Sequence, residues 1–138
     1  MTDYVGSCLC GAVTFDVKGG FDSFYLCHCM RCQKDTGSAH AANLFSRSAK
    51  LTWKSGVDVV TCFTLPGTLH NRSFCSLCGS ALPSTNIPDL LVVPAGCLDV
   101  AVSVPPTAHI FTASKASWGR ESINVPEFEG LPESTRIT

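Results

Sequence analysis

The chain has 138 residues, a formal net charge of −1 and a sequence pI near 6.4. This length fits one domain, residues 1–138, and no basic stripe marks it as a nucleic-acid-binding protein. The N-terminus lacks a secretory pattern, and the longest apolar stretch, residues 90–98, is too short to span a bilayer. We therefore expect a cytoplasmic protein with no nucleic-acid or membrane partner.

Short strands separated by turns are the elements that the sequence predicts, because glycines and prolines punctuate it throughout. In chain order, strands are expected at 12–17, 24–26, 41–45, 51–53, 57–65, 72–74, 90–93 and 109–112. One short helical turn is expected at 31–35, and the tail after Trp118 has an irregular composition. Residues 57–65 alternate well between apolar and polar positions. The pattern indicates a small, mainly β protein.

Seven of the nine cysteines fall into three tight clusters along the chain. The clusters are Cys8-x-Cys10, Cys27-x-Cys29-x-x-Cys32 and Cys75-x-x-Cys78. Thiols this close in sequence do not readily pair with each other as relaxed disulfides. In a reducing compartment, clustered cysteines more often bind metal than form disulfides, so a disulfide framework is the less favoured alternative.

Residues 75–79 have the form of a zinc knuckle, in which two thiolates flank a tight turn and a glycine follows. Cys8 and Cys10 supply the complementary pair, and four thiolates close a tetrahedral structural site. We predict a structural zinc on Cys8, Cys10, Cys75 and Cys78. The ion would tie the N-terminal strand to the middle of the chain, and its binding would contribute to the free energy of folding.

Cys27, Cys29 and Cys32 supply only three thiolates, which would leave one coordination position of a zinc ion open for chemistry. A zinc with three thiolate ligands is a poor Lewis acid toward water, so the site suits an incoming thiolate better than hydroxide. Two alternatives remain. The three cysteines could form a second closed site together with Cys62, Cys97 or His28, or they could hold no metal.

The remaining unusual residues have ordinary interpretations. Cys62 and Cys97 are expected to be buried, inert thiols. His28 lies between two ligands, so its ring should point away from the metal and donate a supporting hydrogen bond. His40, His70 and His109 stand singly and are expected to be satisfied or exposed. Trp53, Trp118 and the eight phenylalanines are expected in the core.

The motifs, in order, cover nearly the whole chain and resemble the glutathione-dependent formaldehyde-activating enzymes, the family grouped with centromere protein V. The matching segments are residues 6–13 (GSCLCGAV), 27–34 (CHCMRCQK), 36–38 (TGS), 72–79 (RSFCSLCG), 95–99 (AGCLD), 109–111 (HIF) and 114–118 (SKASW). The resemblance implies a β-tent fold of small antiparallel sheets around zinc sites. It also implies a structural zinc on Cys8, Cys10, Cys75 and Cys78 and a catalytic zinc on Cys27, Cys29 and Cys32.

The activity that the resemblance implies is a carbon–sulfur lyase reaction. The family's named reaction adds formaldehyde to glutathione to give S-hydroxymethylglutathione, so the expected partners are a small thiol such as glutathione and a small aldehyde. One alternative is a non-catalytic zinc-binding scaffold or interaction module. Another is a redox protein that uses Cys29 and Cys32 as a dithiol–disulfide couple.

Overall fold

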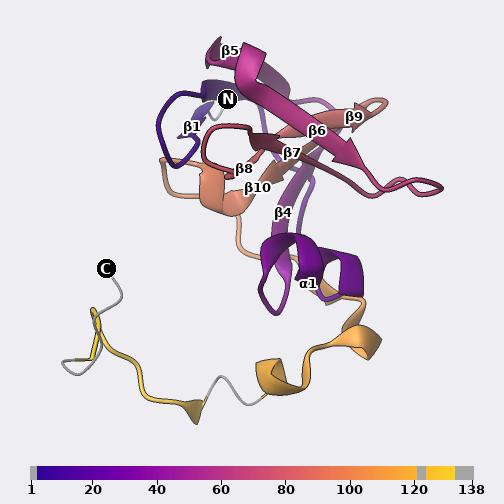
Figure 1. Ribbon diagram of the computed structural model, residues 1–138, viewed down its shortest axis with the longest axis vertical. Helices are drawn as coiled ribbons and strands as arrows, with labels where there is room; N and C mark the ends of the chain where they lie inside the picture. Colours follow the sequence, from indigo (N-terminus) through magenta and orange to yellow (C-terminus); the bar gives the residue numbers. More distant parts are fainter. Residues whose placement is uncertain (1–2, 121–123, 133–138) are drawn as a thin grey trace.

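The computed structural model describes residues 3–120 and 124–132, and strands make up most of its regular structure (Figure 1). The strands are β1 (Asp3–Ser7), β2 (Thr14–Lys18), β3 (Ser23–Cys27), β4 (Ala41–Ser46), β5 (Lys50–Ser55), β6 (Val60–Thr64), β7 (Asn71–Cys75), β8 (Ala81–Leu82), β9 (Ser84–Ile87), β10 (Leu90–Pro94) and β11 (Ala108–Ile110). The helices are α1 (Met30–Thr36) and the 3-10 turns η1 (Val57–Val59), η2 (Ala95–Cys97), η3 (Thr112–Ser114) and η4 (Ser117–Arg120). The expected mainly β fold of small antiparallel sheets is confirmed.

The strands form three small sheets, ordered β1-β2-β5, β11-β3-β4-β10-β9 and β6-β7-β8. Neighbouring strands are antiparallel, except that β11 runs parallel to β3, with Ile110 opposite Cys27. The amide of His28 extends this pairing by donating to the carbonyl of Ile110 at 2.9 Å. β11 therefore lies beside the segment that carries Cys27, Cys29 and Cys32.

The core is built from the apolar positions that alternate along the strands. In β2 the residues Phe15 and Val17 are buried while their neighbours are not, and β10 buries Leu91 and Val93 in the same way. Phe15 also meets Trp53 of β5 edge-on, with ring centroids 5.8 Å apart. Two of the predicted zinc ligands, Cys8 and Cys75, and the lone thiol Cys97 belong to the same buried cluster. The first cysteine site is thus continuous with the hydrophobic core.

Most expected strands are present, and the differences have local causes. Residues 57–65 do not form one strand, because Gly56 adopts a positive φ of 74° and starts the η1 turn before β6. Residues 109–112 stop at Ile110 because Phe111, with φ 55°, leaves the strand. The sequence missed β1, β8 and β9, which are short and rich in small or polar residues.

Two expectations about burial are wrong. Cys62 is exposed, because β6 lies at the edge of its sheet, and it contacts the side-chain amide of Asn86. Trp118 is 60% exposed rather than part of the core, and the phenylalanines at 63, 111 and 128 are also exposed. Cys97 is buried, as expected. Among the described residues, no helix has the length and apolar character needed to cross a membrane.

Candidate metal centres

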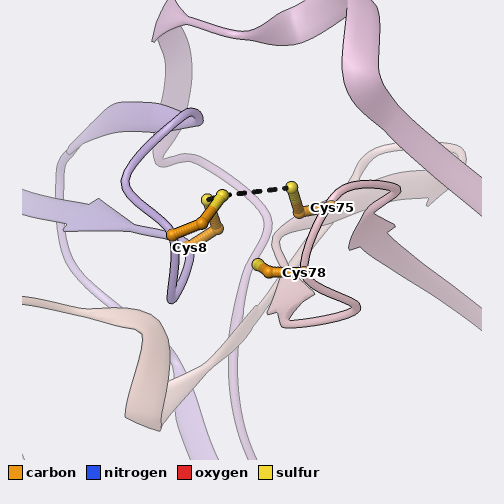
Figure 2. Close-up of side chains that lie close together, drawn as sticks. Cys8, Cys75 and Cys78 are labelled. Carbon is orange, nitrogen blue, oxygen red and sulfur yellow. Dashed lines mark hydrogen bonds between the residues drawn. The ribbon is translucent and has the colours of Figure 1, made fainter.

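The side chains of Cys8, Cys10, Cys75 and Cys78 converge, with all four sulfur atoms within 4.8 Å of one another. The Cys8 and Cys10 sulfurs are 3.6 Å apart, and those of Cys10 and Cys75 are 3.9 Å apart. A tetrahedral zinc with ligands at about 2.3 Å needs sulfur separations of about 3.8 Å. Figure 2 shows the labelled side chains of Cys8, Cys75 and Cys78 directed toward a common centre from two loops.

Two tight turns hold these four thiols. In the first, the Gly11 amide donates to the Cys8 carbonyl at 3.1 Å, and Gly11 takes a φ of 81°. In the second, the Gly79 amide donates to the Cys75 carbonyl at 2.7 Å, and Gly79 takes a φ of 76°. Both conformations favour glycine. The pKa of the Cys78 thiol is lowered to about 6, and the largest cause is a hydrogen bond from the Ser80 amide to its sulfur.

The second centre comprises Cys27, Cys29 and Cys32, whose three sulfurs also lie within 4.8 Å of one another. Cys27 ends β3, and Cys29 is the N-cap of α1, where its sulfur accepts the Cys32 amide at 3.3 Å. Cys32 is buried in the first turns of the helix. One strand end and one helix start thus gather three thiols within six residues. No fourth Cys, His, Asp or Glu ligand joins this group among the described residues.

The surroundings of the three thiols affect their ionisation differently. Burial raises the pKa of both Cys27 and Cys32. Burial also acts to raise the pKa of Cys29, but the Cys32 amide and the neighbouring thiols lower it below its ordinary value. Cys29 is therefore the thiol of this centre that ionises first, and its thiolate can receive a metal ion.

Three histidines, His28, His40 and His109, which the sequence analysis treated as separate residues, form a cluster of neighbouring rings. His28 is 2% exposed, and its Nε2 lies 2.8 Å from Nδ1 of His109. The rings of His28 and His40 are 5.0 Å apart. His28 does not belong to the group of sulfurs, in keeping with the expectation that its ring points away from it. Burial lowers the pKa of His28 below its ordinary value, which favours the neutral form of that ring.

A cavity of about 750 Å³ opens onto the three thiols. Its wall is mostly apolar, with side chains from β4, β10 and β11, and it carries Arg31 and Arg72 as its positive groups. Arg72 donates from Nη1 to the Asp35 carbonyl at 2.6 Å and from Nη2 to the Gly79 carbonyl at 3.1 Å. This volume falls in the usual range for small-molecule sites, about 300–1,000 Å³.

The structure brings together each predicted set of metal ligands, while the cavity and its polar residues were missed by sequence reasoning. The missed residues include His70, whose Nε2 lies 2.8 Å from Oδ2 of Asp35 on the cavity wall. The two residues are 35 positions apart in the chain, so no local motif joins them. Several segments singled out in the sequence, 27–34, 72–79 and 109–111 among them, contribute residues to this wall, but nothing in the sequence shows that they meet.

Comparisons with known proteins agree with the geometry. Residues 3–114 match the model of the glutathione-dependent formaldehyde-activating enzyme family. A Halomonas elongata protein, provisionally named a glutathione-dependent formaldehyde-activating enzyme, is 32% identical over 124 residues, which cover 82% of this chain and 77% of that protein. A crystal structure of a Rhodobacter sphaeroides protein has a TM-score of 0.56 at 22% identity and covers 76% of this chain and 98% of its own. That likeness concerns the fold alone.

Proposed function

Because the chain belongs to the glutathione-dependent formaldehyde-activating enzyme family, we propose that it is a carbon–sulfur lyase-type enzyme. Its reaction would join a small thiol, glutathione, to a small aldehyde, formaldehyde, or cleave their adduct. The observation that carries the proposal is the set of three thiols at the wall of a cavity large enough for a tripeptide. Residues 1–138 would act as one domain in the cytoplasm, where glutathione is abundant and thiols stay reduced.

The proposal assigns one zinc ion to each cysteine group. The sulfur spacing of Cys8, Cys10 and Cys75 fits a closed tetrahedral site, together with Cys78, and this zinc would be structural. Cys27, Cys29 and Cys32 would hold the catalytic zinc. Their soft thiolate donors favour zinc over magnesium or calcium. When bound at this second centre, zinc supplies Lewis acidity that lowers the pKa of a substrate thiol.

The chain's own residues would bind and orient the substrates. The apolar wall from β4, β10 and β11 limits the access of water to the reacting carbon. Arg31 and Arg72 offer positive charge that suits the two carboxylates of glutathione. Holding a thiol and an aldehyde together in this cavity lowers the entropic cost of their encounter.

Two measurements test the proposal. The first is NMR exchange spectroscopy of glutathione with formaldehyde and a panel of other aldehydes, with and without enzyme. Formaldehyde exchange should accelerate with the enzyme, and equal rates with and without it for every aldehyde would contradict the enzymatic proposal. The second is the zinc content of the wild type and of Cys29→Ser, expected to be two ions and one ion per folded chain. One ion in both proteins would instead favour a scaffold with a single structural zinc.

A further inference from the structure

We propose that His70 is the acid–base catalyst of this site and that Asp35 is its positioning residue. The inference rests on the proposed function and adds the proton-transfer group that the three thiols lack. The observation that motivates it is the 2.8 Å hydrogen bond between His70 Nε2 and Asp35 Oδ2, made by two residues that both line the cavity.

The hydrogen bond defines the orientation of the imidazole. A carboxylate only accepts hydrogen bonds, so the Nε2–H of His70 donates to Asp35. In the neutral ring this leaves the lone pair on Nδ1, which has no hydrogen-bond partner among the described residues. Both side chains are partly accessible, with 21% of His70 and 26% of Asp35 exposed. A histidine held by a carboxylate, with its second nitrogen free, is the arrangement that general bases share in many enzymes.

Both partners are held firmly by the backbone around them. His70 ends the loop 65–70 between β6 and β7, where the Leu65 amide donates to the His70 carbonyl at 2.9 Å. The His70 amide in turn donates to Oγ1 of Thr68 at 3.1 Å. Asp35 lies on α1, and its carbonyl accepts from Arg72 at 2.6 Å. The imidazole is therefore presented by a closed hairpin rather than by a free loop.

The position of Asp35 on α1 brings the pair close to the thiols. Cys32 and Asp35 are three residues apart in a helix, and side chains with this spacing lie on the same face, about 5–6 Å apart at Cβ. The same helix thus presents a metal ligand and the carboxylate that holds His70 to one cavity. A substrate sulfur near Cys32 would therefore share this cavity with the imidazole of His70.

The other ionisable groups on the described cavity wall are less suited to this role. They are Cys27, Cys29 and Cys32, which are assigned to metal, Arg31 and Arg72, which stay protonated, and Asp35, which is used in the pair. An imidazole exchanges protons readily near neutral pH. His70 is therefore the group of the described wall that can both take and return a proton.

The proton transfers balance without an oxidant or reductant. In the direction of adduct formation, Nδ1 of His70 takes the proton from the substrate thiol R–SH. The sulfur electron pair then forms the C–S bond to formaldehyde, and the C=O π electrons move onto oxygen. The imidazolium returns its proton to that oxygen, giving R–S–CH₂–OH and the neutral ring. Cleavage of the adduct follows the same steps in reverse.

The test compares His70→Gln and His70→Ala with the wild type by NMR exchange of glutathione and formaldehyde. A general acid–base group contributes about 100-fold or more, so kcat should fall by that amount while KM and zinc content stay close to wild type. Added imidazole should restore part of the activity of His70→Ala. Asp35→Asn should lower kcat at least about tenfold, because an amide no longer selects the Nε2–H tautomer. The matched control is Asp16→Asn, which removes the carboxylate of the Lys54 ion pair at 3.3 Å and should leave kcat unchanged.

A second readout does not depend on activity. Long-range ¹H–¹⁵N spectra of the wild type should show the His70 ring as the Nε2–H tautomer, and this preference should be lost in Asp35→Asn. A His70→Gln protein that exchanges within about twofold of an active wild type would overturn the inference and leave the proposed function standing. A wild type no faster than buffer would overturn both.

Discussion

The two cysteine groups should differ in how much they stabilise the fold, and the pair Cys78→Ser and Cys29→Ser tests this. Each substitution removes one partly exposed thiol from its group and replaces it with the smallest polar analogue. Serine is also a favoured N-cap, so Cys29→Ser keeps the start of α1 intact. The comparison therefore isolates the metal link from local helix effects.

The expected magnitudes follow from the length of chain that each metal would bridge. Cys10 and Cys75 are 65 residues apart, and a cross-link over such a loop restricts the unfolded chain by about 4 kcal/mol. The three thiols from Cys27 to Cys32 fall within six residues and can bind metal in the unfolded chain as well. Metal bound equally to both states contributes little to folding. We expect a loss of about 4 kcal/mol for Cys78→Ser and less than about 1 kcal/mol for Cys29→Ser.

The assay is thermal unfolding with zinc in slight excess, followed by far-UV circular dichroism. For a domain of this size, about 4 kcal/mol corresponds to a decrease in Tm of about 10–20 °C. Zinc content measured on the same samples should fall by one ion in each variant. Equal decreases in Tm for Cys78→Ser and Cys29→Ser would refute the reasoning, because the second centre would then be structural too.

Three further predictions concern residues outside the metal groups. Gly6→Ala should lower the unfolding free energy by about 3 kcal/mol in chemical denaturation, because its Cβ would lie 2.6 Å from the Cys97 carbonyl and overlap the Phe15 ring; Gly20→Ala, where nothing lies within 4 Å, should change little. Burial raises the pKa of Cys97 from its ordinary 9.0 to about 12, so its stabilising contribution is complete below pH 9 and is lost as pH rises toward 12. From pH 8 to pH 10 the wild type should therefore lose about 1 kcal/mol more than Cys97→Ala, and parallel curves would contradict this. Arg72→Leu should lower the unfolding free energy by about 2 kcal/mol in the same denaturation assay, because the Asp35 and Gly79 carbonyls lose a charged hydrogen-bond donor. An unchanged unfolding free energy would show that water replaces the guanidinium as the donor.

The grouping of the cysteines could be predicted from the sequence because each group depends largely on short-range spacing. Cys29 and Cys32 are joined by a helix turn, and Cys75 and Cys78 by a tight loop, so the chain itself brings them together. Only the pairing of Cys8 and Cys10 with the second loop is long-range, and there the need for four ligands supplied the missing constraint.

The cavity wall could not be predicted, because its residues meet only through tertiary packing. His70 comes from a hairpin loop and Asp35 from a helix, and the two positions are 35 residues apart, so no local spacing links them. The exposure of Trp118 and Cys62 was missed for a related reason. Apolar character indicates which residues favour burial, but the tertiary arrangement determines which ones are covered. Cys62 lies on the edge strand β6, and Trp118 lies after the last strand, and both are exposed.

The parallel pairing of β11 with β3 has a bearing on biosynthesis. His28 leaves the ribosome 81 residues before His109, the residue to which it hydrogen-bonds, and at 5–20 residues per second this delay lasts about 4–16 seconds. Throughout that interval the three neighbouring thiols lack the strand that later flanks them. A nascent chain can therefore take up metal, or be oxidised, at this segment before its sheet is complete.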